Sequence, residues 1–426
     1  MLDHYILSNG IVTDGITFLY ENCDIEITDK KILRIGKALE ADYNIKKIDL
    51  DGRLVLPGLL NPHHHLYSAL ATGLAPIGPT NNFQQILDNL WWHLDKTLDE
   101  ESIYYSAMNG LMQSIRYGVT TVIDHHASMN AISGSLNIIK KAFKEIGIKG
   151  VLCYEISDRM GEGSLQKQID ENINFWTANQ ANERIQGLLG LHANFTLSEK
   201  SMKNIAKEKF DALPIHIHCG EDLADLQYCR DLGYEGPVHR LNEFGLLSQD
   251  ALLAHCIHLS EKDHELLNEI QPHIILNPES NANNNVGQMD MQKIKKYVLG
   301  TDGMTGNILG TMRSHFLQRN GNIPDALKVL FRYPAEMING YFPNSGTLKV
   351  NGIADLAICN YRPVTPISMD NLFYHLMFGV QGKEMYMTIS EGKIIFFGNK
   401  IHSIDEDQMN IEISAAVKKL HETYYA

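Results

Sequence analysis

Two histidines separated by one residue, His63 and His65, follow the short apolar segment that ends at Leu60. On an extended segment the side chains of residues i and i+2 point to the same side, so these two imidazoles converge while His64 points elsewhere. Converging imidazoles at the end of a buried strand are suited to bind a divalent metal ion. For this pair taken alone, the alternative is a solvated histidine loop that binds no metal.

Further candidate ligands stand at the ends of three later apolar segments. His218 ends one segment, and Glu221 follows it three residues later. His255 ends the next segment, and Asp302 follows the last one. A single histidine at a strand end is commonly a core residue. Imidazoles and carboxylates at four segment ends together favour a catalytic metal site, because these groups bind metal ions and transfer protons.

Eight short apolar segments predict the strands that position these residues. They are separated by stretches long enough for a helix, such as 101–117 and 134–146. The segments are 54–60, 120–124, 150–155, 187–191, 215–218, 252–255, 274–277 and 297–301. This alternation predicts buried parallel strands, and eight of them in about 250 residues is the count of an α/β (β/α)8 TIM barrel. The carboxyl ends of all strands then open on one face, where catalytic residues gather. A doubly wound sheet is the alternative, but the sequence has no glycine-rich phosphate-binding fingerprint.

Both ends of the chain carry β-patterned segments. Residues 24–28 and 32–36 are strand-like on either side of a break at residues 29–31, which predicts a hairpin. The similar segments near the other end are 355–359, 385–389 and 394–397. The pattern indicates one small sheet domain assembled from both ends.

The composition excludes several classes of protein. Of the 426 residues, 44% are apolar and 21% are charged, which is typical of a globular protein with a sizeable core. The net charge of −14 argues against nucleic acid or an anionic membrane surface as the partner. We expect neither a signal peptide nor a membrane span, because the sequence starts without a basic and apolar leader and has no apolar run of about 18 residues. Six cysteines without a CxxC pair suit a reduced, cytoplasmic protein.

Four motifs occur in an order and spacing that one protein family shares. They are Pro57–His65, His218-x-x-Glu221, Ala254-His255-Cys256 and Gly300–Gly303. With these motifs the chain resembles the amidohydrolase superfamily, in its cytosine deaminase and chlorohydrolase-like branch. Residues 90–105, 122–128 and 190–196 are similar to one group of aminohydrolases within that branch.

The resemblance covers essentially the whole chain and implies its architecture. We expect a metal-dependent TIM barrel over residues 58–344. Residues 1–57 and 345–426 would form a composite β-sandwich, the latter segment with a terminal helix. The resemblance also implies a homodimer.

Carried over residue by residue, the resemblance implies a metal site and the groups around it. The metal ligands would be His63, His65, His218 and Asp302. Glu221 and His255 would act as acid–base groups beside the metal, and His192 would face the substrate. Relatives with two metals bridge them with a carboxylated lysine on the fourth strand. Leu189–His192 contains no lysine, which points to one divalent ion, with zinc as the first expectation and iron as the second.

The expected reaction is hydrolytic deamination of a small heterocyclic amine with a purine- or pyrimidine-like ring. A zinc ion with these ligands lowers the pKa of a water to about 7. Asp302 would contact the metal and take the proton of this water, while Glu221 would carry a proton to a ring nitrogen and then to the leaving amine. His255 would polarise the water or stabilise the tetrahedral oxyanion.

Three alternatives use the same barrel. A chlorohydrolase would displace halide. Because halide leaves without a proton, that reaction does not need Glu221 to protonate the leaving group. The missing fourth-strand lysine counts against a hydrolase of cyclic amides. A non-catalytic scaffold has no reason to retain all six candidate groups.

Further candidate site residues each allow two interpretations. Trp92, with Trp91, either forms a pocket wall that stacks on a flat ring or anchors a helix or a dimer contact. Either His125 or His126 reaches the cavity, and His126 is named as the candidate substrate contact. Arg159 either contacts substrate or belongs to a structural ion pair.

Overall fold

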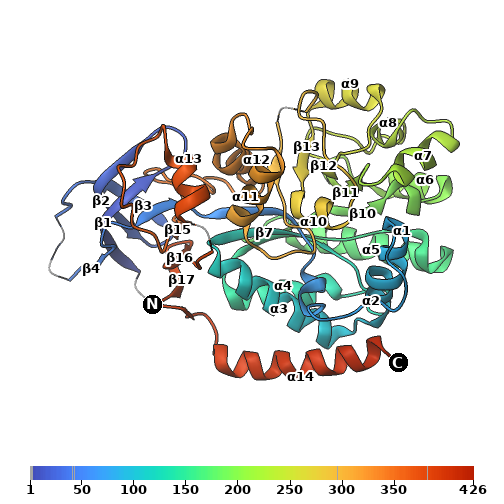
Figure 1. Cartoon of the computed structure of the whole chain (residues 1–426). Coiled ribbons are helices and arrows are strands. Elements are labelled where there is room, and N and C mark those ends of the chain that lie inside the picture. The colour runs from blue at the N-terminus through green and yellow to red at the C-terminus, as the bar shows by residue number, and fades with distance from the viewer. Residues whose placement is uncertain (1–2, 41, 43, 295, 381) are drawn as a thin grey trace.

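The computed structural model describes residues 3–40, 42, 44–294, 296–380 and 382–426. Parallel strands form a ring in the larger part of the molecule (Figure 1). In chain order they are β6 (Leu59–His64), β7 (Val119–His126), β8 (Lys149–Tyr154), β9 (Ile185–Gly187), β10 (Leu189–Ala193), β11 (Ile215–Cys219), β12 (Leu252–His255), β13 (His273–Leu276) and β14 (Val298–Leu299). They make two sheets, β6-β7-β8-β9 and β10-β11-β12-β13-β14.

Backbone bridges join the edges of these two sheets. His64 pairs with Asp302 between β6 and the end of β14, and Ile156 pairs with Leu191 beyond the end of β8. β9 and β10 are separated by a single residue, Leu188, and together occupy one position of the ring. The eight predicted strand positions are thus present, in a barrel and not a doubly wound sheet.

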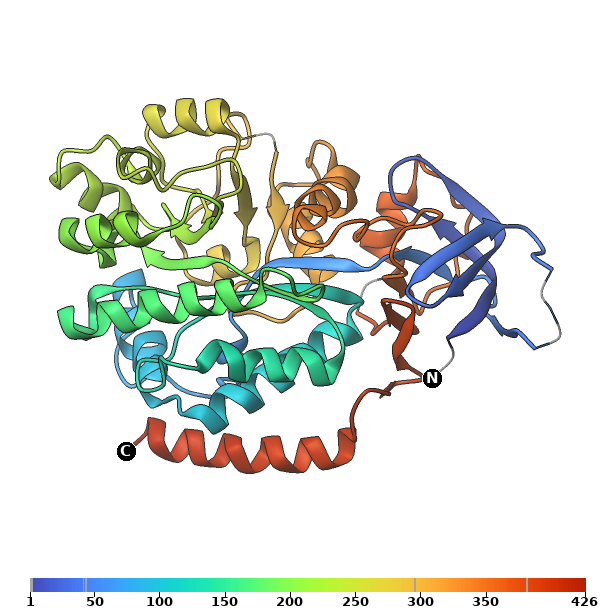
Figure 2. The same cartoon turned by 180° about the vertical axis from the view of Figure 1, so that it is seen from behind.

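Helices surround the barrel, as Figures 1 and 2 show from opposite sides. The helices along the barrel are α1 (Phe83–Ile86), α2 (Trp92–Thr97), α3 (Glu100–Arg116), α4 (Ser135–Ile146), α5 (Glu162–Asn179), α6 (Glu199–Glu208), α7 (Leu223–Asp231), α8 (Pro237–Glu243), α9 (Glu261–Ile270), α10 (Pro278–Asn283), α11 (Ile308–Gln318) and α12 (Tyr333–Tyr341). Neighbouring residues explain where α3 begins and α4 ends. Asp99 caps the start of α3, because its carboxylate accepts a hydrogen bond from the Ser102 amide at 2.8 Å in a capping box. Gly147 caps the end of α4 with a φ of 89°, which favours glycine.

The amphipathic pattern of α4 shows how a helix packs on the barrel. Leu136, Ile139, Phe143 and Ile146 are buried and recur at the spacing of one helix face. This face lies against β8, where Gly150 leaves room for the Phe143 ring. Burial of one large aliphatic or aromatic side chain contributes roughly 1.5–3 kcal/mol, so such faces hold the helices in place.

The strands of both chain ends pair in one mixed sheet, as the sequence predicts. Its strands are β1 (His4–Thr13), β2 (Leu19–Thr28), β3 (Lys31–Gly36), β4 (Lys46–Asp49), β5 (Leu54–Pro57), β15 (Leu356–Ile358), β16 (Met387–Ser390), β17 (Lys393–Phe397) and β18 (Lys400–Ile401). β2 and β3 form the predicted hairpin with Thr28 opposite Lys31. β5 and β15 join the two halves, with Leu56 opposite Ala357. The domain boundaries after residues 57 and 344 stay a prediction.

One predicted strand was wrong in its extent. By the apolar pattern, residues 54–60 were counted as one of the eight barrel segments, but β5 lies in the mixed sheet and only β6 lies in the barrel. The chain passes between them at Gly58, where an added side chain would come within 2.3 Å of the Thr120 hydroxyl.

The two parts of the molecule are held together by buried charge and by the last helix. Lys149 at the start of β8 donates to the Asp355 carboxylate at 2.6 Å, and both side chains are buried. The long α14 (Glu406–Tyr424) runs along α2 and α3 at the bottom of Figure 1. The remaining short helix is α13 (Leu372–Tyr374). No helix in the described ranges is long and apolar enough to cross a membrane.

Candidate metal centre and active site

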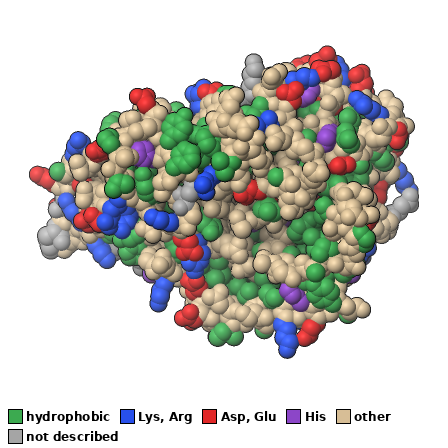
Figure 3. All heavy atoms as spheres, in the orientation of Figure 1, with side chains coloured by type: hydrophobic (Ala, Val, Ile, Leu, Met, Phe, Trp, Pro, Cys, Tyr) green, Lys and Arg blue, Asp and Glu red, His purple; other side chains and the backbone are tan. Residues whose placement is uncertain are grey.

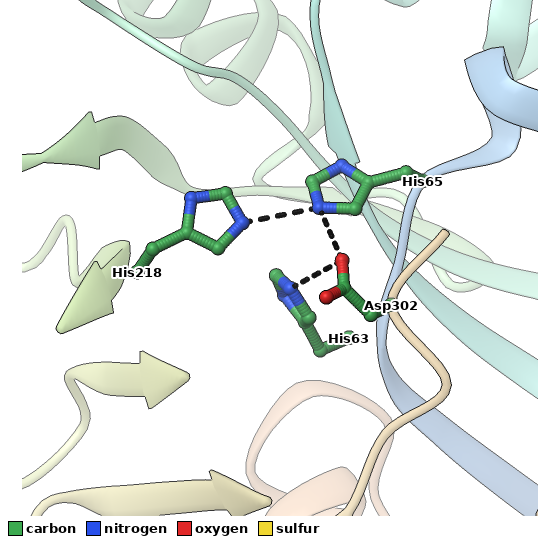
Figure 4. Close-up of side chains that lie close together, drawn as sticks. All are labelled: His63, His65, His218 and Asp302. Atoms are coloured by element: carbon green, nitrogen blue, oxygen red, sulfur yellow. Dashed lines mark hydrogen bonds and ion pairs between the residues drawn. The ribbon is translucent and has the colours of Figure 1, made fainter. Parts of the chain in front are cut away.

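The predicted metal ligands meet at the carboxyl ends of the barrel strands. His63 lies in β6, His65 follows it, His218 lies near the end of β11, and Asp302 follows β14. Figure 4 shows the three imidazoles and the Asp302 carboxylate pointing toward one another. One ligand atom from each of the four residues lies within 4.8 Å of the others.

The distances within this set fit a single small divalent ion. The Nε2 atom of His65 lies 3.1 Å from Nε2 of His218 and 2.9 Å from Oδ1 of Asp302. Nε2 of His63 lies 3.6 Å from the same carboxylate oxygen. Ligand atoms about 2.0–2.1 Å from a tetrahedral metal lie about 3.3 Å from one another. The buried Nε2 of His63 has no hydrogen-bond partner among the described residues, as expected for a metal ligand.

Hydrogen bonds to groups around the ligand set determine which nitrogen of each imidazole ring faces the site. Nδ1 of His65 donates to the carbonyl oxygen of His125 at 2.6 Å, and Nδ1 of His218 donates to that of His192 at 2.9 Å. Because a carbonyl only accepts, both rings carry a proton on Nδ1 and turn Nε2 toward the candidate metal site. Nδ1 of His63 lies 2.9 Å from Nε2 of His216.

The electrostatics of the four groups favour a bound cation. Burial opposes ionisation of Asp302, but the contacts with His63 and His65 outweigh it and hold the pKa of Asp302 well below its usual range. Burial also favours the neutral His65 ring, yet the hydrogen bond to Asp302 raises the pKa of His65 to about 9. Burial lowers the pKa of His63 to about 3. The site therefore keeps an anionic carboxylate beside at least one neutral imidazole.

Glu221 and His255 lie beside the ligand set. Nε2 of His255 lies 3.5 Å from Oε2 of Glu221 and 3.7 Å from Oδ2 of Asp302. Nδ1 of His255 donates to the Asn281 side-chain oxygen at 2.7 Å, and the Asn284 amide donates to Oε1 of Glu221 at 3.3 Å. Burial raises the pKa of Glu221 to about 7, so this carboxyl group can both hold and release a proton near neutral pH.

The backbone is strained where it carries two of these groups. His255 has a φ of 73° and Asp302 a φ of 55°, in the left-handed region that side-chain-bearing residues rarely occupy. Such strain persists where surrounding contacts hold it, and it is concentrated at functional sites.

A pocket opens directly above the ligand set. It holds about 750 Å³ of empty space, part of it open to solvent, and His65, His218, Glu221 and Asp302 form its polar floor. Its walls include Trp91, Trp92, Phe195, His192, Glu155 and Met304. The His192 ring lies edge-on to the rings of Trp92 and Phe195, and burial lowers its pKa to about 3. A flat heterocycle fits between such aromatic walls.

The predicted substrate contacts divide into two groups. His192 and Trp92 line the pocket. The His126 ring is buried behind the wall, with Nε2 2.9 Å from the Ser128 hydroxyl. The Arg159 guanidinium is also buried behind it and donates to Asp95 at 2.7 Å and Glu155 at 2.8 Å. For His126 and Arg159 the role in substrate binding stays a prediction, since neither lines the pocket.

Sequence reasoning missed three residues that orient the site. His216 contacts His63, Asn281 orients His255, and Asn284 contacts Glu221. The alternation in Ile215-His216-Ile217-His218 places both histidines on one side of β11, so His216 could have been found from the strand period. The two asparagines gave no such signal, because their partners lie 26 and 63 residues away along the chain.

The chain is similar to known proteins over nearly its whole length. Over 414 residues the chain is 28% identical to the 5-methylthioadenosine/S-adenosylhomocysteine deaminase of Thermococcus sibiricus, with 92% of this chain and 93% of that protein aligned. The fold matches an adenosine deaminase from Xanthomonas campestris with bound zinc, at a TM-score of 0.84 and 15% identity over 98% of both chains. It also matches a zinc complex of atrazine chlorohydrolase from Arthrobacter aurescens, at a TM-score of 0.80 and 19% identity over 97% of this chain and 100% of that one.

The motifs, the barrel and the ligand set lead to the same assignment. The sequence model described as "Amidohydrolase family" matches residues 54–395, which include the barrel, the ligand set and the strand β15 that joins the mixed sheet. The chain belongs to the amidohydrolase family.

Proposed function

We propose that the protein is a metal-dependent aminohydrolase that deaminates a purine- or pyrimidine-like heterocycle and releases ammonia. The observation that carries the proposal is the position of Glu221, a largely buried carboxyl group that faces His255 beside Asp302 at the floor of an aromatic pocket. The aligned relative is named for deamination of two adenosine derivatives, which supports a purine amine as the substrate class.

The residues of the chain have separate tasks in this reaction. A divalent ion held by the four candidate ligands would supply a water molecule whose pKa is low enough for attack on the ring carbon near neutral pH. Asp302 accepts the proton of that water. Glu221 delivers a proton to the ring nitrogen and then to the leaving amine, while His255, as an imidazolium with its second proton on Nε2, donates toward the developing oxyanion. Trp92 and His192 hold the ring and limit access of bulk water.

The proposal is tested by a screen of heterocyclic amines with the metal-loaded enzyme. We expect ammonia release from at least one aminopurine or aminopyrimidine, with the corresponding oxo compound as product. Chlorinated triazines are included as the comparison, with halide release as the measurement. Halide release without ammonia release from any amine would replace deamination by the chlorohydrolase alternative.

One divalent ion per chain is expected, with zinc first and iron second. Three imidazole nitrogens and one carboxylate oxygen suit both metals, and the fold neighbour with bound zinc supports zinc. Elemental analysis of protein purified without chelator measures the stoichiometry, and chelation followed by reloading identifies the metal that restores activity. Two ions per chain in that preparation, or none after metal supplementation, would contradict this prediction.

A homodimer is expected in solution, as the family resemblance implies. Trp91 and Trp92 face the pocket, so another apolar surface has to provide the contact. Hydrophobic side chains gather over α13 in Figure 3. Tyr374 at the end of α13 and Phe378 just beyond it are 53% and 60% exposed. Light scattering at micromolar concentration should give twice the chain mass of 48.0 kDa. The mass of a single chain would refute the expectation.

We also infer a cytoplasmic location. All six cysteines are buried free thiols, which suits a reducing compartment.

A further inference from the structure

A second set of ligand-capable atoms adjoins the predicted metal site. His65, His125, Glu155 and His218 place one ligand atom each within 4.8 Å of one another, and all four residues are buried. His125 lies in β7 and Glu155 directly follows β8, so this set uses the second and third strands of the barrel. The family resemblance implies no role for either residue.

The hydrogen bonds of His125 leave its Nδ1 lone pair facing a carboxylate. Nε2 of His125 lies 3.2 Å from the carbonyl oxygen of His216, which only accepts, so Nε2 carries the proton of the neutral ring. Nδ1 then presents its lone pair to Oε2 of Glu155, 3.2 Å away. Neither atom has a hydrogen-bond partner in the described part of the chain. Two buried acceptors at this distance repel each other unless a cation or a proton lies between them.

The two histidines that complete the set also turn one nitrogen toward it. The Nε2 atoms of His65 and His218 face each other at 3.1 Å, because each Nδ1 donates to a backbone carbonyl. The separations of 3.1 and 3.2 Å are close to the about 3.3 Å expected between ligands of one tetrahedral ion. Like the first set, this one offers three imidazole nitrogens and one carboxylate oxygen.

We propose that His65, His125, Glu155 and His218 form a second position for a divalent ion that excludes occupation of the first. The two positions share the Nε2 atoms of His65 and His218, and one imidazole nitrogen binds one metal ion. One ion per chain therefore remains the expected stoichiometry. The ion prefers the first position, because the Arg159 guanidinium donates to Glu155 at 2.8 Å and competes for its charge. The proposal rests on metal binding by the proposed enzyme, not on its substrate.

The test removes the first position and asks whether an ion still binds. Co²⁺ is the probe, because its visible absorption reports ligand type and geometry, and equilibrium dialysis gives the stoichiometry. Asp302→Ala should still bind one Co²⁺, more weakly and with a changed spectrum. Asp302→Ala/Glu155→Gln should bind at least about tenfold more weakly than Asp302→Ala, since a ligand is lost. Asp302→Ala/Glu243→Gln is the matched control, because it makes the same charge change at the surface and should bind like Asp302→Ala.

A second double variant keeps the test decisive if loss of the Arg159 partner unfolds the protein. In Asp302→Ala/His125→Gln the amide can still donate to the His216 carbonyl, the Arg159–Glu155 pair remains, and only the Nδ1 ligand is lost. Weakened Co²⁺ binding in this variant supports the proposal. If Asp302→Ala binds no Co²⁺, or if neither additional substitution weakens binding, His125 and Glu155 form an ion pair only and the proposal fails. Wild-type protein that binds no Co²⁺ would instead contradict the metal-dependent function itself.

Discussion

Glu221→Gln is expected to retain the fold and the metal ion yet lose about 10²–10⁴-fold in kcat, the amount that a positioned acid–base group typically supplies. The amide has nearly the same shape as the carboxyl group and can keep the contact with Asn284, but it cannot carry a proton between water, ring and leaving amine. The measurement is kcat on the best amine found in the screen, at full metal loading and with KM determined separately.

The matched control for this variant is Glu243→Gln, which removes one carboxylate from a half-exposed position in α8. It should leave kcat within about twofold of the wild type, since surface substitutions away from special features have small effects. If Glu221→Gln behaves like this control at full metal loading, Glu221 is not the proton carrier, and the argument for deamination over halide displacement is lost.

His218→Ala is expected to abolish both metal binding and activity. His218 is shared by the two ligand sets, so its removal leaves neither position complete. The loss of metal affinity should exceed the roughly 10–100-fold that removal of an outer partner of a metal ligand costs. Elemental analysis and Co²⁺ titration measure binding, and the thermal unfolding midpoint shows whether the protein is still folded.

His273→Ala is the control for loss of an imidazole from the barrel. His273 begins β13, at the amino end of the strand and away from the carboxyl-end face of the barrel. This variant should retain one ion per chain and its activity. A folded His218→Ala protein that keeps a full complement of tightly bound metal would show that the ion binds elsewhere.

The strand pattern and the spacing of the histidines could be predicted because both depend on local geometry. A buried parallel strand requires a short apolar run, and the period of two requires His63 and His65 to share one side. The carboxyl ends of parallel strands meet on one face, so His218 and Asp302 could be assigned to the same site as that pair. The division of residues 54–60 between two sheets could not be predicted from the strand pattern alone, because an apolar strand has the same pattern in either sheet.

Contacts between distant segments could not be predicted, because they depend on how the closed barrel places side chains from different strands. Arg159 illustrates this limit: its sequence position allows a substrate contact or an ion pair, and the structure pairs it with Asp95, 64 residues earlier in the chain. His125 and His126 are neighbours on one strand and point to opposite sides, so the period of two requires that only one faces the ligands but does not say which. Their register against the neighbouring strands places the His125 ring centroid 4.8 Å from that of His218.

The sequence by itself therefore predicted the barrel and the gathering of the candidate ligands, Glu221 and His255 on one face of it, because strand period and the placing of groups at strand ends are local properties of the chain. The family resemblance added the division of these groups into metal ligands and an acid–base pair. Only the tertiary structure decided which nitrogen of each ring faces the candidate metal site, which residues contact Glu221 and His255, and that Glu155 and His125 place ligand-capable atoms beside those of His65 and His218. These features depend on hydrogen bonds and close contacts between segments that are far apart in the sequence, and only the packing of the closed barrel brings such segments together.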